Sequence, residues 1–170
     1  MGSSELKLPP PFEEAMRSLE RSIMRFLLHA TGDREDSLDL FQETWLRAYR
    51  AYPTLKSKDG LKPWVFRIAV NLCRNRARDR MRRARVISSD GHDFAALSER
   101  AASSRRGSLD GLLGLKRELA RLPGKQGQAL MMRKFAGLEY DEIATALQCS
   151  PESARASVYQ ALKKLKAEQL

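Results

Sequence analysis

The arginine-rich stretch from Pro63 to Arg85 limits what this chain can fold into more than any other segment. Its first half repeats apolar side chains at the spacing of one helical face: Trp64, Val65, Ile68, Ala69 and Leu72. Its second half sets a run of arginines against one acid, Asp79: Arg74, Arg76, Arg78, Arg80, Arg82, Arg83 and Arg85. No small core buries guanidinium groups that point in several directions. The pattern predicts one helix that begins in a core and ends as a cationic extension.

The excess of positive charge predicts a polyanionic partner. Among 170 residues, Lys and Arg number 31 against 21 Asp and Glu, a formal net charge of +10. Phosphate is the anion that a guanidinium fork matches best. An anionic membrane is the rival, but no apolar run approaches the roughly 18 to 20 residues of a membrane span. The N-terminus also lacks the pattern of a signal peptide. We therefore expect a cytoplasmic protein without membrane insertion.

Cysteines and histidines are too sparse to predict a metal site. The chain has two of each, Cys73, Cys149, His29 and His92, without C-x-x-C spacing or a neighbouring Cys and His. We expect reduced, partly buried cysteines, no metal and no cofactor. A redox role for Cys73 or Cys149 stays open at this point.

Two amphipathic helices are predicted before the arginine-rich one. Apolar side chains at helical spacing indicate helices over 12–29 and 37–52. Gly32 is suited to the position just past a helix end, and Pro53 stops the second helix. With the stretch 63–85, these helices predict one small all-α unit.

The composition changes after the arginines. Residues 86–110 contain six serines and few large apolar side chains, which is typical of a flexible linker. Beyond it, apolar spacing indicates helices over 112–122, 126–136 and 140–147, then a last helix that begins at Pro151. The predicted fold is all-α, with two small helical domains joined by this linker. Its segments are a disordered N-terminus 1–11, a first domain 12–85, the linker 86–110 and a second domain 111–170.

The last two predicted helices have the pattern of a helix-turn-helix. A tight turn joins them, Ala144 is small enough for their crossing, and Ser150 is a suitable N-cap before Pro151. In such a motif the second helix enters the major groove, where an arginine such as Arg155 grips guanine O6 and N7. Lysines further along approach phosphates: Lys163, Lys164 and Lys166. A plain αα-hairpin gives the same pattern, so the motif alone does not decide.

Three blocks of the sequence resemble the extracytoplasmic-function (ECF) sigma factors, bacterial initiation factors made of a sigma-2 domain, a linker and a sigma-4 domain. The blocks are 39–49 (DLFQETWLRAY), 63–71 (PWVFRIAVN) and 137–144 (GLEYDEIA), the last followed by Ser150-Pro151 and the helix 155–165. The resemblance extends from Phe12 to Ala167. Glu139 departs from it, since the family commonly has a serine cap there, and we expect a weaker helix start.

The resemblance implies roles for three sets of residues. Docking on the clamp helices of the polymerase beta-prime subunit falls to Asp39, Leu40, Gln42, Glu43 and Leu46. Recognition of the minus-ten element, with Asn71 near a flipped base, falls to Trp64, Arg67, Asn71, Arg74, Asn75, Arg78 and Arg82. Recognition of the minus-thirty-five element falls to Glu152, Ser153, Arg155, Ala156, Ser157, Tyr159 and Lys163. The arginines from Arg74 onward are expected to hold phosphates of the opened strand. Trp64 is favoured as a core residue because it lies on the apolar stripe.

The resemblance also implies partners: core RNA polymerase, through the beta-prime clamp helices and the beta flap, promoter DNA, and an anti-sigma factor. We expect a free monomer that directs polymerase to promoters and helps to melt them without catalysing a covalent step. The alternative is a dimeric helix-turn-helix regulator that binds inverted repeats and does not dock on polymerase. An enzyme such as a recombinase would need a nucleophile and paired carboxylates in an α/β domain, and the N-terminal half has no strand pattern.

Overall fold

The computed structural model describes residues 9–57, 60–89, 122 and 124–167, with side chains described up to residue 85 in the second range. All regular secondary structure in these ranges is helical, which confirms the predicted all-α fold. The helix expected over 112–122 lies outside the described residues except for Leu122, which is buried. The linker from residue 90 onward and residues 1–8 of the N-terminus also lie outside them.

The first two helices form a hairpin whose turn follows from its capping residues. Helix α1 spans Phe12–Thr31 and ends at Gly32, whose φ of 65° is left-handed as predicted for this glycine. Helix α2 spans Arg34–Ala51 and begins earlier than the sequence pattern indicated. The reason is Asp33, whose side chain accepts a hydrogen bond of 3.0 Å from the backbone N–H of Asp36 and so caps the helix.

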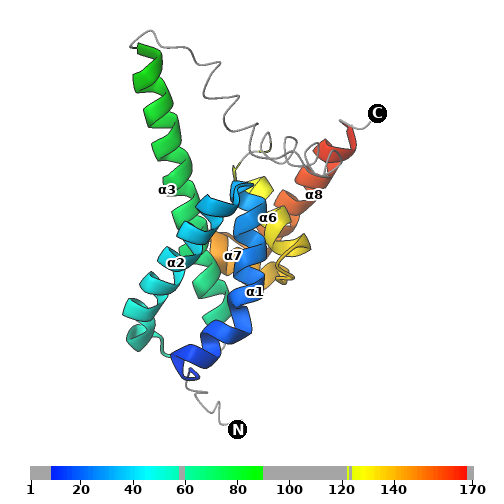
Figure 1. Cartoon of the computed structure of the whole chain (residues 1–170). Helices are drawn as coiled ribbons and strands as arrows, with labels where there is room; N and C mark the ends of the chain where they lie inside the picture. Colours follow the sequence, from blue (N-terminus) through cyan, green and yellow to red (C-terminus); the bar gives the residue numbers. More distant parts are fainter. Residues whose placement is uncertain (1–8, 58–59, 90–121, 123, 168–170) are drawn as a thin grey trace.

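Helix α3, Leu61–Ser89, is the arginine-rich helix, and it follows a short 3₁₀ turn, Tyr52–Thr54. Pro63 lies in its first turn, where a missing N–H costs no hydrogen bond. The beginning of α3 is buried through Val65, Phe66, Ala69, Val70 and Leu72. Its other end extends beyond the remaining helices (Figure 1). The helix also continues through residues 86–89, which the sequence pattern assigned to the linker.

These helices pack around an aromatic and aliphatic core. Phe26 of α1 and Phe66 of α3 are fully buried and meet edge to face, with ring centroids 5.6 Å apart. At the other end of the domain, Phe12 packs edge to face against Trp45 and Tyr52. The Tyr52 hydroxyl donates a hydrogen bond to the Pro10 carbonyl, so the chain just before α1 is fixed to this domain.

The C-terminal domain consists of α6 (Gly124–Lys134), α7 (Tyr140–Leu147) and α8 (Pro151–Ala167). Gly137 has a φ of 67° in the turn before α7, a left-handed conformation that glycine adopts readily. At the start of α7, Glu142 accepts a hydrogen bond of 2.8 Å from the Glu139 backbone N–H. This bond compensates for the absence of a serine cap at position 139. Helices α7 and α8 and their tight turn confirm the predicted helix-turn-helix elements.

The two domains pack against each other through α3 with α7 and α1 with α6, side by side in Figure 1. The His29 ring of α1 stacks on Phe135, with centroids 3.7 Å apart and planes 18° from parallel. Near the start of α3, the Lys62 ammonium lies 3.3 Å from the Glu142 carboxylate. The sequence pattern predicted two domains but did not predict this closed arrangement.

Candidate polymerase and nucleic-acid surfaces

A groove of about 760 Å³ separates α2 from α3, and we call it the α2–α3 groove. Its lining residues are Asp39, Leu40, Gln42, Glu43, Leu46 and Arg47 of α2 and Leu72, Asn75, Arg76 and Asp79 of α3. All five positions predicted to dock on polymerase are among them. Leu40 is only 4% exposed and forms part of the floor, whereas Leu46 is 43% exposed. The groove therefore combines an apolar floor with a charged rim.

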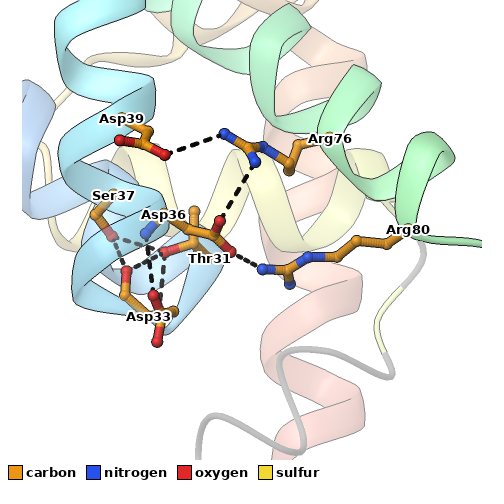
Figure 2. Close-up of polar contacts among 7 residues, drawn as sticks. All are labelled: Thr31, Asp33, Asp36, Ser37, Asp39, Arg76 and Arg80. Atoms are coloured by element: carbon orange, nitrogen blue, oxygen red, sulfur yellow. Dashed lines mark hydrogen bonds and ion pairs between the residues drawn. The ribbon is translucent and has the colours of Figure 1, made fainter. Parts of the chain in front are cut away.

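Ion pairs join the two sides of the groove (Figure 2). The Arg76 guanidinium lies 3.5 Å from the Asp36 carboxylate and 3.7 Å from that of Asp39. Arg80, one turn further along α3, forms a second ion pair with Asp36. Arg76 and Arg80 thus neutralise acids of their own domain in the free chain, although the resemblance implied that the arginines from Arg74 onward hold DNA phosphates. Acids of α2 and arginines of α3 each recur at one-turn spacing in the sequence, but this spacing does not identify which helix packs against which.

Asp36 is placed by the polar network at the start of α2 (Figure 2). Ser37 is fully buried, and its hydroxyl donates a hydrogen bond to the Asp33 carbonyl. The Thr31 hydroxyl lies 2.7 Å from the Ser37 hydroxyl and accepts a hydrogen bond of 3.1 Å from the Asp33 backbone N–H. Because each buried hydroxyl has a partner, this network fixes the first turn of α2 and the direction of Asp36.

The residues predicted to recognise the minus-ten element differ in exposure. Exposed side chains are Asn71, Asn75, Arg78 and Arg82, and half-buried ones are Trp64, Arg67 and Arg74. The Arg82 side chain is 78% exposed, and its guanidinium lies 3.7 Å from the Asp79 carboxylate. Asn75 also lines the α2–α3 groove.

Two of these half-buried side chains are held by protein contacts. Arg74 donates a hydrogen bond of 3.0 Å to the buried side chain of Gln128 on α6, so it belongs to the interface between the domains. Trp64 packs against the core, and its ring centroid is 6.4 Å from that of Tyr52. Trp64 is therefore a half-buried residue at the edge of the core, on the side of α3 that the apolar stripe indicated.

The exposed surface of α8 carries most of the residues predicted to recognise the minus-thirty-five element. The buried side chains of α8 are Ala154, Val158, Ala161 and Leu165. The exposed ones among the predicted set are Glu152, Ser153, Arg155, Ala156, Tyr159 and Lys163, and Ser157 is half-buried. The Ser150 hydroxyl accepts a hydrogen bond of 3.2 Å from the Ser153 N–H, which confirms the predicted N-cap.

Glu152 contributes to the first turn of α8 through its charge. Its own backbone N–H and the Ser150 hydroxyl hydrogen-bond to its carboxylate, and both lower the pKa of Glu152. A carboxylate there is also favoured by the positive end of the helix dipole. Glu152 therefore stabilises the helix start, a role that the recognition pattern did not assign to it.

Cys73 differs from a reactive thiol. Burial raises the pKa of Cys73 to about 12, so its thiol stays protonated near neutral pH.

Within the described ranges, no group of three or more His, Cys, Asp or Glu side chains is arranged to hold a metal ion. The described helices also include none that is both long and apolar enough to cross a membrane.

Comparison with known families matches both domains. A model of sigma-70 region 2 matches residues 15–83, and a model of sigma-70 region 4 matches residues 112–165. The chain therefore belongs to the sigma-70 family. Within this family it is an ECF sigma factor, a factor for transcription initiation. Sigma factors are known as transcription factors and not as enzymes.

Curated relatives match along most of their length. The RNA polymerase sigma-H factor of Pseudomonas aeruginosa is 27% identical over 157 residues, covering 88% of this chain and 81% of that protein. The ECF RNA polymerase sigma-E factor of Escherichia coli is 27% identical over 134 residues, covering 74% of this chain and 70% of that protein.

Solved structures share the fold. The sigma factor RpoE from Bartonella quintana, in complex with the anti-sigma factor NepR, has a TM-score of 0.71 at 23% identity, covering 92% of this chain and 94% of that one. CnrH in complex with the cytosolic domain of CnrY has a TM-score of 0.68 at 18% identity, covering 93% and 86%.

Proposed function

We propose that this cytoplasmic ECF sigma factor docks on core RNA polymerase through the α2–α3 groove and reads promoter DNA with α3 and α8. It directs polymerase to two promoter elements and assists melting without catalysing a covalent step. The observation that carries the proposal is the separation of the surfaces. All five docking positions line one groove, while exposed arginines of α3 and exposed polar residues of α8 lie outside it.

The chemistry of the groove fits a helix of mixed character. Leu40, Leu46 and Leu72 provide apolar contact. The rim acids Asp39 and Glu43, which pair with Arg76 and Arg47 in the free chain, can exchange these partners for basic side chains of a ligand. A partner helix with an apolar face and flanking basic side chains satisfies both requirements. The beta-prime clamp helices are the proposed occupant, and the resemblance adds the beta flap as a second contact for the C-terminal domain.

The two DNA surfaces have different chemistry. Near the middle of α3, the exposed amide of Asn71 can donate and accept along the edge of an unpaired base, and Arg78 and Arg82 can contact phosphates. Arg74 joins them only when the domains separate, because Gln128 holds it in the closed arrangement. On α8, Arg155 is the proposed guanine reader and Lys163 a phosphate contact.

An anti-sigma factor is the proposed regulatory partner. Support comes from the two similar structures, one of which is a complex with the anti-sigma factor NepR and the other a complex with the cytosolic domain of CnrY. Their likeness to this chain extends over both domains, so a partner of this kind is compatible with the whole fold.

Reconstitution with core polymerase tests the proposal. Core polymerase plus this chain should produce transcripts from a genomic template library that core alone does not produce, and no such transcripts would reject the proposal. Glu43→Lys reverses a charge in the groove and should weaken assembly with core at least fivefold. Glu20→Lys makes the same change on the exposed surface of α1 and should leave assembly unchanged.

The oligomeric state separates this proposal from its alternative. Light scattering of the free chain should give the mass of a monomer. A dimer that binds inverted repeats would favour a dimeric helix-turn-helix regulator that does not dock on polymerase.

A further inference from the structure

Tyr140, the first residue of α7, lies against two guanidinium groups. The guanidinium carbon of Arg155 on α8 is 5.1 Å from the centroid of the Tyr140 ring, and that of Arg133 on α6 is also 5.1 Å away. Both distances are within the range of a cation–π contact. The tyrosine thus connects the recognition helix to the rest of its domain through a side chain that the docking and recognition sets do not include.

The two arginines differ in what else holds them. Arg133 lies 2.9 Å from the Glu139 carboxylate and donates a hydrogen bond of 3.0 Å to the Leu138 carbonyl. Its position is therefore fixed by contacts within the domain. Arg155 is exposed, and among the described residues it forms no hydrogen bond or ion pair, although the charge of nearby Glu152 attracts it. Contact with the Tyr140 ring restricts the Arg155 side chain and leaves its N–H donors free.

We infer that Tyr140 is a positioning residue that holds the Arg155 guanidinium in place for reading a guanine in the upstream promoter element. The inference rests on the proposed role of α8 and adds a specificity determinant to it. A free arginine loses rotamer freedom when it binds a base edge, and a side chain already held on a ring loses less. The planar guanidinium suits this arrangement because it can stack on a ring and present its N–H groups sideways.

The effect should be confined to the base pair that Arg155 reads. Lys163 and other phosphate contacts act without regard to sequence, so loss of the ring leaves them intact. A cation–π contact at an exposed site corresponds to about a two- to fivefold change in an equilibrium constant. The ring face makes the contact, so phenylalanine should replace tyrosine.

Selection by the assembled polymerase tests the inference. Core polymerase carrying the wild-type chain, Tyr140→Phe, Tyr140→Leu, Arg155→Ala or the double variant Tyr140→Leu/Arg155→Ala is used to select DNA from a pool with a randomised upstream element. Arg155→Ala should abolish the base preference at one position. Tyr140→Leu should lower that preference two- to fivefold and leave other positions unchanged, and Tyr140→Phe should keep it. The double variant should match Arg155→Ala.

Other results would overturn either the positioning role of Tyr140 or the proposed function of α8. An unchanged preference in Tyr140→Leu, or an equal loss at every position, overturns the positioning role alone. If the wild-type assembly selects no upstream sequence, the proposed function of α8 fails instead. A measurement on the free wild-type chain does not depend on the folding of any variant. The Arg155 side-chain protons should resonate upfield of those of exposed Arg82 because of the Tyr140 ring current, and equal shifts would overturn the contact.

Discussion

The Arg76 guanidinium on α3 lies 3.5 Å from the Asp36 carboxylate on α2, so the cationic helix is attached to an acidic helix of its own domain. The Asp36 side chain is 18% exposed and also pairs with Arg80. A carboxylate with so little solvent requires a counter-charge. The arginine-rich helix is therefore divided between arginines that maintain the fold and arginines that are available to a ligand.

Asp36→Ala should destabilise the N-terminal domain more than Asp39→Ala. Asp36 is the less exposed acid and balances two arginines, so its loss should lower the free energy of unfolding by about 1–2 kcal/mol. The Asp39 side chain is 61% exposed, and its loss should lower the free energy of unfolding by less than about 1 kcal/mol. Urea unfolding followed by tryptophan fluorescence reports this domain, because both tryptophans, Trp45 and Trp64, lie in it. Equal effects of the two substitutions on the free energy of unfolding would contradict the larger structural role of Asp36.

Lys62→Glu should open the closed arrangement of the domains. Lys62 now lies 3.3 Å from the Glu142 carboxylate and donates a hydrogen bond to the Gly137 carbonyl. The substitution removes both contacts and places a second acid beside Glu142. Such partly exposed contacts contribute about 0.5–1 kcal/mol, enough to shift an equilibrium severalfold. Hydrogen exchange of α7 amides should accelerate and the radius of gyration should increase. Lys56→Glu, an equal charge change on an exposed residue outside this interface, should leave both unchanged.

The sequence predicted most of what local spacing decides. The buried face of α8 follows from apolar side chains at helical intervals, and Gly32 and Ser150 mark helix boundaries by their backbone and capping chemistry. On α3 the predicted stripe included the buried Val65, Ala69 and Leu72 but also the half-buried Trp64 and Ile68, and it left out the fully buried Phe66 and Val70. Glu139 was misleading when considered by itself, since its backbone N–H is satisfied by Glu142.

Contacts between helices could not be predicted in the same way. The pairing of Asp36 with Arg76 and the hydrogen bond of Arg74 to Gln128 depend on how helices approach in space. A helical period decides which face of a helix is buried but not which neighbour covers it. The resemblance to the ECF sigma factors grouped the docking positions on α2. It did not identify the α3 residues that line the other side of the groove, because the packing of α3 against α2 is not visible in the sequence.

Cys73 should make the stability of the N-terminal domain fall at alkaline pH. Burial raises the Cys73 pKa from an ordinary value of 9.0 to about 12, so the folded state retains a proton that the unfolded state releases. This contribution is fully present below pH 9 and is lost as the pH rises toward 12, with a slope of at most about 1.4 kcal/mol per pH unit. Lysines and tyrosines titrate in the same range, so the comparison is between wild type and Cys73→Ala. The variant should be less stable at pH 7 and show a shallower decline from pH 9 to 11, whereas parallel curves would contradict a buried thiol.

The division of the α3 arginines should be visible in the salt dependence of nucleic-acid binding. Each arginine that contacts a phosphate of single-stranded DNA contributes about 0.7 to the slope of log affinity against log salt concentration. Arg82 is 78% exposed, so Arg82→Ala should lower this slope by about one such step. Arg80 is paired with Asp36, and Arg80→Ala should change the slope less while weakening the fold. The measurement is a potassium chloride titration of the full chain on a random single-stranded oligonucleotide of 30 nucleotides, monitored by fluorescence anisotropy and limited to variants that remain folded. If Arg80→Ala lowered the slope as much as Arg82→Ala, the ion pair with Asp36 would have to open on binding, and Arg80 would belong with the arginines that face DNA.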